Sequence, residues 1–256
     1  MKALIVPDIH LKPWIFDRAE SILQKSLCDK TVFLGDFVDD WDQQNNIGLY
    51  NETFDRLLKY AKDHESLICW GNHDMSYLWH RLETGFSYMA ELTVRERIKE
   101  IEKFMNGNYF SDKLTADRAA YMHRIDNVLF SHGGLMASFV YDHKEAIAEM
   151  ANKKEKDLSI DDIVKYINHL GGTFMWEDNS PLWARPNYAK FDGIFKVTPP
   201  VGPPMLQVVG HTPVPKVTAY DGYVLCDTFS TYEGKPIGSQ ELIIIDTKTT
   251  VFESVK

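Results

Sequence analysis

The amino-acid sequence predicts an α/β fold built on parallel strands. In the N-terminal part, apolar runs of strand length at residues 2–6, 31–34 and 66–70 alternate with helical patterns at 14–27 and 49–62. This order favours parallel pairing, because each helix carries the chain back to the edge from which the strand began. Short polar blocks follow the apolar runs, and parallel sheets bind ligands beyond the carboxyl ends of their strands.

The two N-terminal helices are predicted from their spacing. Each repeats apolar residues every three or four positions, which gives the helix one face to bury. These residues are Ile15, Ala19, Ile22, Leu23 and Leu27 in the first helix, and Phe54, Leu57, Leu58 and Ala61 in the second. The polar residues 41–48 predict a loop between the second strand and the second helix.

The middle of the chain predicts mostly helices around a pair of strands. Residues 75–107 read as mostly helical, and 109–117 as irregular. Two strands at 119–125 and 127–130 join at Asp126-Asn127. Two further helices are expected at about 142–152 and 159–170, the second with acidic residues in its first turn.

The C-terminal part predicts a long loop and then strands. Residues 171–204 are rich in Pro, Trp and Asn and lack periodicity, which is typical of a functional loop. The apolar run at 206–209 predicts a strand. Two hairpins complete the chain, one turning at Asp221-Gly222 and one formed by residues 241–246 and 250–253.

The chain shows no repeat and no low-complexity linker, so we expect one domain over residues 1–256. Its helical cap or insertion segments are expected at about residues 85–120 and 140–200.

Composition excludes some classes of protein. The chain has 256 residues, 44% of them hydrophobic, which suffices for a sizeable core. A net charge of −9 without a Lys/Arg block argues against a nucleic-acid partner. A phosphorylated substrate stays compatible with this charge, because bound cations would supply positive charge locally. No apolar run reaches the roughly 20 residues that span a bilayer, so no membrane partner is expected.

Cysteine usage favours a reducing compartment. The three cysteines, Cys28, Cys69 and Cys226, form no CxxC motif, and the last two lie in strand-like runs. Buried free thiols are the preferred interpretation, and one disulfide is the alternative. The N-terminus begins as a strand without a signal peptide, so we expect a cytoplasmic protein.

Five polar blocks that follow apolar runs carry the chemistry of this sequence. A single such block is typical of an ordinary turn, but five accidents at the ends of five strands are improbable. The blocks are Asp8-Ile9-His10, Gly35-Asp36-Phe37-Val38-Asp39, Gly71-Asn72-His73-Asp74, Ser131-His132-Gly133-Gly134 and Gly210-His211-Thr212. Imidazole and carboxylate groups together suit Zn, Fe, Mn or Co, so these blocks predict a metal site.

The residue types predict a site for two divalent cations that hydrolyse a phosphate ester. Two ions about 3.5–4 Å apart can neutralise the phosphoryl oxygens and provide a nucleophile at neutral pH. Asp36 is the candidate bridge between the ions, because a carboxylate can bind both, and Asp8 and His10 can reach one of them. The expected remaining ligands of the second ion are Asn72, His132 and His211.

Three further residues have predicted roles in hydrolysis. His73 directly follows a ligand and is free to protonate the leaving oxygen. Asp39 could orient His73 and keep it charged. Arg185 could grip the phosphate with its planar guanidinium, although a lone arginine is also typical of a surface.

The blocks resemble the calcineurin-like metallophosphoesterase superfamily, and within it the phosphoprotein phosphatase branch. The branch is indicated by Gly35–Asp39, by Ser131-His-Gly-Gly-Leu135, and by Gly210-His-Thr-Pro213, which lacks a second histidine. The segment from Pro181 to Pro186 is similar to the phosphate-binding arginine region of bacterial serine/threonine phosphatases and symmetrical dinucleoside tetraphosphatases.

The resemblance implies a fold and the same ligand set. The family fold is a four-layer α-β-β-α sandwich of two mixed sheets flanked by helices. The family pattern implies Asp8, His10 and Asp36 on one metal, and Asp36 on the other as well. It implies the remaining roles as follows: Asn72, His132 and His211 on the second metal, His73 with Asp39 as the acid pair, and Arg185 on phosphate.

Two positions depart from the family pattern. Asp40 stands where the family usually has a phosphate-binding arginine, which reverses a charge. Either another cation, such as Lys12 or Arg81, substitutes for it, or the substrate differs from a phosphoprotein. Asp74 replaces the usual glutamate after the histidine, which is a smaller change.

The sequence thus predicts a metal-dependent hydrolase. We expect a serine/threonine-phosphatase-like phosphomonoesterase that uses a metal-bound hydroxide, with manganese as the effective ion in vitro and Fe, Zn or Co as alternatives. Its partner is a phosphorylated substrate, such as a phosphoprotein, a nucleotide or a small phosphoester. One alternative is a dinucleoside polyphosphate or other nucleotide phosphohydrolase. The other alternative is a protein-binding scaffold that has lost catalysis.

Overall fold

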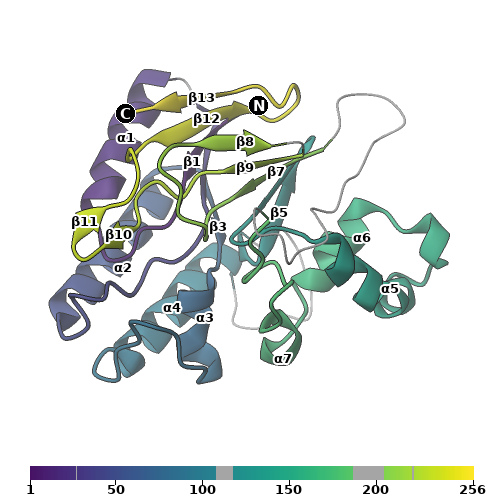
Figure 1. The fold of residues 1–256 in the computed structure, drawn as a ribbon, viewed down its shortest axis with the longest axis horizontal. Helices are drawn as coiled ribbons and strands as arrows, with labels where there is room; N and C mark the ends of the chain where they lie inside the picture. Colours follow the sequence, from purple (N-terminus) through teal and green to yellow (C-terminus); the bar gives the residue numbers. More distant parts are fainter. Residues whose placement is uncertain (27, 108–117, 187–204, 221) are drawn as a thin grey trace.

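Two mixed β-sheets pack face to face, with helices flanking the pair (Figure 1). A computed structural model describes residues 1–26, 28–107, 118–186, 205–220 and 222–256. The architecture confirms the four-layer α-β-β-α sandwich expected from the sequence. Because both sheets contain parallel strands, segments distant in sequence can end at the same edge of the sandwich.

The first sheet is built around the N-terminal strands. β1 (Lys2–Val6), β2 (Lys30–Phe33) and β3 (Ser66–Cys69) pair in parallel, with Leu4 opposite Thr31. This pairing confirms the arrangement predicted from the strand–helix order. Three more strands complete the sheet. On one side, β12 (Leu242–Asp246) pairs antiparallel with β1, and β13 (Phe252–Val255) pairs antiparallel with β12. On the other side, β4 (Ala119–Ala120) pairs in parallel with β3.

The second sheet has a parallel centre and antiparallel edges. Its central strands are β6 (Val128–Ser131), β7 (Leu206–Val209) and β9 (Tyr223–Leu225). The edges are β5 (Met122–Ile125) and β8 (Thr218–Tyr220), and the β8–β9 pair confirms the predicted hairpin. A small ladder of β10 (Thr231–Tyr232) and β11 (Lys235–Pro236) was not predicted.

A purely apolar layer joins the two sheets. It contains Ile5 and Val32 from the first sheet and Phe130, Val208 and Val224 from the second, all at most 1% exposed. Burial of each such side chain stabilises the fold by about 1.5–3 kcal/mol. The sheets are therefore a rigid support for the loops at their edges. The free thiols of Cys69 and Cys226 lie in the same layer, as the sequence predicted.

Amphipathic helices cover the outer faces. The long ones are α1 (Trp14–Ser26), α2 (Ile47–Asp63), α4 (Glu91–Asn106) and α5 (Ala137–Ala151), and a shorter one is α6 (Ile160–Ile167). In Figure 1, α1 and α2 lie beside the N-terminal strands, and α5 and α6 lie at the opposite end. The short α3 (Asn72–Trp79) and α7 (Gly172–Met175) complete the set. Among the helices that the structure describes, none is long and apolar enough to cross a membrane.

One predicted strand is in fact two. The apolar residues 119–125 divide at Tyr121, so that β4 joins the first sheet and β5 joins the second. The Asn168 side-chain oxygen accepts hydrogen bonds from the backbone N–H groups of Tyr121 (3.1 Å) and Met122 (3.0 Å). Where the chain passes from the first sheet to the second, the Asn168 side chain thus supplies the hydrogen bonds that a neighbouring strand would otherwise make.

Helix boundaries also differ from the prediction. The segment 75–107 contains α3 and α4, separated by residues 80–90, which begin with His80 in the left-handed conformation that ends α3. α5 begins at Ala137, earlier than the sequence indicated. The predicted irregular segment at 109–117 and the later part of 171–204 lie outside the described residues. The extent of the cap or insertion segments stays a prediction.

Candidate metal and active site

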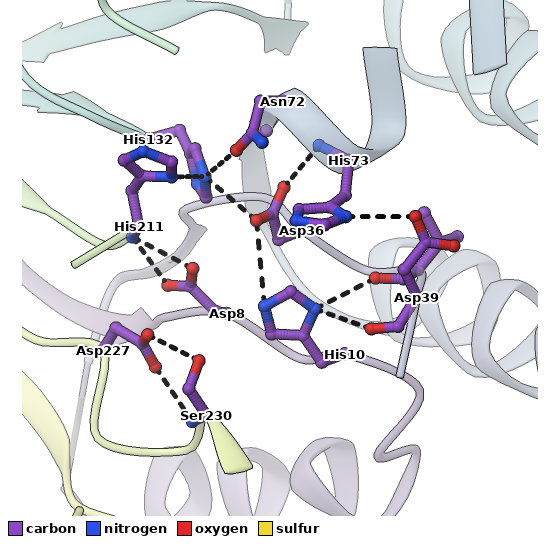
Figure 2. A network of polar contacts seen from close by, with 12 residues as sticks. Asp8, His10, Asp36, Asp39, Asn72, His73, His132, His211, Asp227 and Ser230 are labelled. Atoms are coloured by element: carbon purple, nitrogen blue, oxygen red, sulfur yellow. Dashed lines mark hydrogen bonds and ion pairs between the residues drawn. The ribbon is translucent and has the colours of Figure 1, made fainter. Parts of the chain in front are cut away.

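Five parallel strands deliver polar side chains to one edge of the sandwich. β1 is followed by Asp8 and His10, and β2 by Asp36 and Asp39. β3 runs into α3, whose first residues are Asn72 and His73, and β6 and β7 are followed by His132 and His211. Figure 2 shows these side chains pointing toward one another from separate elements. Side chains from over two hundred positions of sequence therefore share one buried site.

Strained backbone marks this edge. His10, Asp36, Asp39 and His211 all have positive φ, between 43° and 65°. This left-handed region costs most L-residues energy, although Asp and His enter it more readily than bulky residues. The concentration of four such residues at one edge indicates that the surrounding structure holds them for a function.

One half of the site converges on His132. Its Nε2 lies 3.1 Å from Asp36 Oδ2, 2.9 Å from Asn72 Oδ1 and 3.0 Å from His211 Nδ1. Its Nδ1 lies 2.8 Å from the carbonyl oxygen of Leu34, to which it donates. Burial alone would lower the pKa of His132, but the charge of Asp36 outweighs it and raises the pKa to about 9. A positive charge is thus favoured at the point where these electron-pair donors meet.

The other half contains Asp8, His10 and Asp36. Candidate ligand atoms of these three residues lie within 4.8 Å of one another, and Asp36 belongs to both halves. His10 Nδ1 contacts the carbonyl oxygens of Val38 (3.1 Å) and Asp39 (2.8 Å), so its Nε2 is directed toward Asp36 at 3.8 Å. Burial lowers the pKa of His10 to about 3, which keeps the ring neutral, as a metal ligand must be.

His73 and Asp39 form a pair beside the ligand cluster. His73 Nδ1 lies 3.0 Å from Asp39 Oδ2, and the backbone N–H of His73 donates to Asp36 Oδ1 at 3.0 Å. The hydroxyl groups of Tyr50 and Tyr77 both donate to Asp39 Oδ1 and hold that carboxylate in place. Burial alone would lower the pKa of His73, but Asp36 and Asp39 raise it to about 9.

The structure corrects the expected backbone around His73. We predicted an extended turn after β3, whereas Asn72 and His73 are the first residues of α3. Successive helical residues point about 100° apart, because a turn has 3.6 residues. Asn72 can therefore face His132 while His73 faces Asp39, which is the separation that the sequence argument required.

Arg185 lies at the rim of the site. Its Nη1 donates to the carbonyl oxygen of His211 at 2.6 Å. The preceding Trp183 packs edge-on against the His211 ring, with centroids 5.6 Å apart. Close backbone contacts fix this segment, since the N–H of Gly133 donates to Pro181 O at 2.6 Å. The structure thus brings Arg185 beside the ligand cluster, as the sequence suggested.

The sequence profile of the family described as Calcineurin-like phosphoesterase matches residues 1–236. The chain belongs to the calcineurin-like phosphoesterase family. This membership confirms the family expected from the motifs and shows that the chain is a phosphoesterase. The family is dinuclear-metal dependent, which agrees with the two Asp/His groups that share Asp36.

Solved protein phosphatases have the same fold as this phosphoesterase. A cold-active protein-tyrosine phosphatase from a psychrophilic Shewanella species is 16% identical, with a TM-score of 0.50. A serine/threonine phosphatase from Saccharomyces cerevisiae, similar to human phosphatase PP5, is 14% identical, with a TM-score of 0.54. Each alignment covers 100% of this chain and 80% of the other. No curated protein sequence matches the chain.

The donor set of this phosphoesterase fits two divalent cations. His10 and His132 each direct Nδ1 at backbone carbonyls, which leaves Nε2 available for a metal. Asn72 contributes a neutral oxygen, and His211 is neutral because burial and the neighbouring His132 lower its pKa. Burial alone would raise the pKa of Asp36, but His132 and His73 lower it, so the carboxylate is ionised. His10, His211 and Asp36 are thus in the forms that metal binding requires, and His132, whose pKa is about 9, would release a proton when a metal binds.

Three supporting roles were not predicted from the sequence. Asp227 follows β9, and burial and its charge near Asp8 raise the pKa of Asp8 well above its usual value. The signal was present, because Asp227 ends an apolar run as the other blocks do. Asp74 accepts hydrogen bonds from the N–H groups of Asp36 (2.8 Å) and Phe37 (2.9 Å), which ties two loops together. Glu83, whose pKa burial raises to about 7, has no sequence signal.

Asp40, which stands where the family usually has an arginine, lies at the edge of the site. Asp40 Oδ2 is 3.8 Å from Lys12 Nζ, and this lysine also donates to the carbonyl oxygen of His10 at 3.1 Å. Arg81, the other cation considered, lies over the Trp176 ring at 6.0 Å. Lys12 therefore offsets the negative charge of Asp40 next to the ligands, and Arg81 contacts a different part of the surface.

Two glycines are required by the closeness of the ligands. A Cβ at Gly210 would overlap the Asp8 carboxylate, and one at Gly71 would overlap that of Asp36. Gly210→Ala is expected to displace Asp8 and to weaken Mn²⁺ binding by about 10–100-fold, as for loss of a residue that orients a ligand. Isothermal titration calorimetry measures this. Gly48→Ala is the matched control, because its Cβ would meet nothing closer than 3.6 Å. Equal affinities for both variants would contradict the expected displacement.

Proposed function

We propose that this phosphoesterase hydrolyses a phosphate monoester at the site formed by the two Asp/His groups, in the manner of a serine/threonine phosphatase. The observation that carries the proposal is the convergence on Asp36 of both ligand groups and of the backbone N–H of His73. The proposed ligands are Asp8, His10 and Asp36 for one ion, and Asp36, Asn72, His132 and His211 for the other.

The chain's own residues would prepare the reaction. When bound, the two divalent ions neutralise the phosphoryl oxygens and supply a water-derived nucleophile at neutral pH. Asp36 links the two ligand groups, because its Oδ2 lies 3.1 Å from His132 Nε2 and 3.8 Å from His10 Nε2. The Asp74 carboxylate fixes the loop that carries Asp36, because it accepts hydrogen bonds from the backbone N–H groups of Asp36 and Phe37. The ligands are thus positioned before a substrate arrives.

His73 is the proposed proton donor. Its Nδ1 is held by Asp39, so Nε2 is the nitrogen available for the leaving oxygen. Its raised pKa of about 9 keeps the ring protonated at neutral pH, as a general acid needs. Burial raises the pKa of Asp39, while hydrogen bonds from His73 and two tyrosines favour its charged form. Asp39 is the proposed orienting partner of His73.

Arg185 and Lys12 are the proposed cations for the phosphate. Arg185 has one guanidinium nitrogen on His211 O, which directs the planar group along the rim of the site. Lys12 is close to Asp40 and to His10, and its position offsets the charge reversal at Asp40. With Asp40 in place of an arginine, recognition of the phosphate itself is expected to be weaker than in the family pattern.

A phosphoprotein or another phosphomonoester is the first substrate candidate. The titles of the Shewanella and yeast structures name protein phosphatases, and the likeness at 16% and 14% identity is in the fold alone. Nucleotide phosphohydrolysis is the second candidate. The scaffold alternative lacks support, because the His73–Asp39 pair is complete.

Manganese is the proposed activating ion, and free Cys28, Cys69 and Cys226 favour a reducing compartment such as the cytoplasm.

A direct assay tests this proposal. Purified protein, stripped by chelation and then supplied with Mn²⁺, is expected to hydrolyse p-nitrophenyl phosphate and to leave bis(p-nitrophenyl) phosphate nearly untouched. Release of p-nitrophenolate measures both reactions. The stripped protein is the control and is expected to be inactive. Preference for the diester would overturn the monoesterase assignment, and no turnover with any divalent ion would favour the scaffold.

A further inference from the structure

An exposed tryptophan stands beside the proposed proton donor. Trp41 keeps 42% of its surface exposed, although tryptophan is usually among the more buried residues. Its ring centroid lies 5.7 Å from that of His73, in an edge-to-face arrangement, and 5.6 Å from that of His10. An aromatic surface therefore borders the place where a leaving group would depart.

The local backbone holds Trp41 in this position. Gly85, which has a φ of +88°, packs against Trp41 and Asp39. A Cβ at Gly85 would be 3.5 Å from the Trp41 ring and 3.4 Å from Asp39 Cβ. The following turn is closed by a hydrogen bond from the N–H of Gln43 to Asp40 O at 2.8 Å. Ser87 donates to the carbonyl oxygen of Gln44 and ties the turn to the segment before α4. Trp41 is thus held in place by the segment that precedes α4.

The geometry limits which leaving groups Trp41 can contact. A leaving oxygen that receives a proton from His73 lies about 3 Å from the donor nitrogen. Because the Trp41 and His73 rings are 5.7 Å apart, a ring attached directly to that oxygen can approach Trp41 within the range of about 4.5–7 Å in which aromatic centroids interact. A serine or threonine ester would present only an aliphatic carbon at this distance. The tryptophan therefore favours an aryl ester.

The charge at the rim supports the same choice. Asp40 replaces a family arginine and takes up part of the charge of Lys12, and Glu83 adds a second carboxylate near His73, so the rim holds the phosphate less strongly than the family pattern would. Contact with the leaving group can offset the weaker hold on the phosphate. We propose that Trp41 forms a subsite for an aromatic leaving group, so that the substrates are aryl phosphates, of which phosphotyrosine is the protein-borne form. This inference rests on the proposed function.

The test compares two substrates of equal chemical reactivity. One is phenyl phosphate, and the other is an alkyl phosphate whose alcohol is fluorinated to match the acidity of phenol. Trp41→Ala is expected to lower kcat/KM for phenyl phosphate by about tenfold, the upper range of an aromatic pair, and to change the alkyl substrate less than about twofold. Trp41→Phe should restore most of the loss. Tyr141→Ala, an exposed aromatic on α5, is the matched control.

Binding without turnover provides a second measurement. Mn²⁺-loaded Trp41→Ala is expected to bind phenylphosphonate about tenfold more weakly than the wild type, with methylphosphonate unchanged, by calorimetry. An equal loss for both substrates and both phosphonates would show that Trp41 only packs over the two histidines, and would overturn the proposal. If the wild type hydrolyses neither phosphate, the proposed function fails instead.

Peptide substrates distinguish the sources of the aryl group. A phosphotyrosine peptide preferred over the matching phosphoserine peptide, with the preference lost in Trp41→Ala, supports the aryl subsite and assigns it to proteins. A Trp41-dependent preference confined to phenyl phosphate supports the subsite and assigns it to small aryl phosphates. A phosphoserine peptide preferred over both would overturn the inference.

Discussion

Asp36→Asn is expected to remove turnover and metal binding together. Asp36 belongs to both ligand groups, so its amide replacement weakens both ions at once. The charge stabilisation lost with the ions amounts to several kcal/mol, which corresponds to about a thousandfold or more in kcat. Turnover of p-nitrophenyl phosphate and the metal content of the purified protein, measured by mass spectrometry, check this result.

The fold of the Asp36 variant is expected to survive. The apolar layer between the sheets does not include this side chain, so circular dichroism should be unchanged. The wild type should gain thermal stability as Mn²⁺ is added, because a ligand that binds only the folded state stabilises it, and the variant should lose this gain. Asp55→Asn, whose side chain is 61% exposed, is the matched control. Retained turnover with an equal metal content would remove the basis of the two-metal proposal.

The strands were predictable because their signals are local. The runs before Asp8, Asp36 and Asn72 are continuous apolar strands of a buried parallel sheet, which sequence patterns identify well. The polar block after each run then had to lie at the carboxyl edge, because parallel strands share that edge. The candidate ligands thus followed from strand order, without knowledge of how the second sheet packs.

Other features depended on tertiary contacts. The division of residues 119–125 between two sheets depends on Asn168, which lies far along the chain and has no local signal near β4. The helical start at Asn72 was missed because its N-terminal cap is Gly71, which makes no side-chain cap hydrogen bond. Asp227 follows the second strand of a hairpin, where a polar residue is typical of an ordinary turn, and only the fold brings it near Asp8.

The rim of the site was the least predictable part. Trp41 and Glu83 sit in segments without periodicity, and only the folded structure brings them beside His73. The pairing of Asp40 with Lys12 joins the loops after β1 and β2. Loops placed by a rigid support set the environment of the substrate, so specificity is less readable from local sequence than the ligand set.

His73→Asn is expected to separate proton donation from metal binding. An alkyl phosphate needs a proton on its leaving oxygen, so loss of the donor should lower kcat for a phosphoserine peptide by about 10²–10⁴-fold. p-Nitrophenolate leaves without a proton, so the same variant should lose far less on p-nitrophenyl phosphate. Metal content should stay at the wild-type level, in contrast to Asp36→Asn. His169→Asn, on the surface after α6, is the control.

The pH dependence provides an independent check on the His73–Asp39 pair. His73 must be protonated to donate, so activity on an alkyl phosphate falls as the pH rises through its pKa, which is about 9 in this structure. Asp39 raises that pKa, and Asp39→Asn should therefore lower it and move the alkaline fall to lower pH. An equal loss of kcat for alkyl and p-nitrophenyl substrates, with the alkaline limb unmoved in Asp39→Asn, would assign His73 to packing beside Asp36 instead of proton donation.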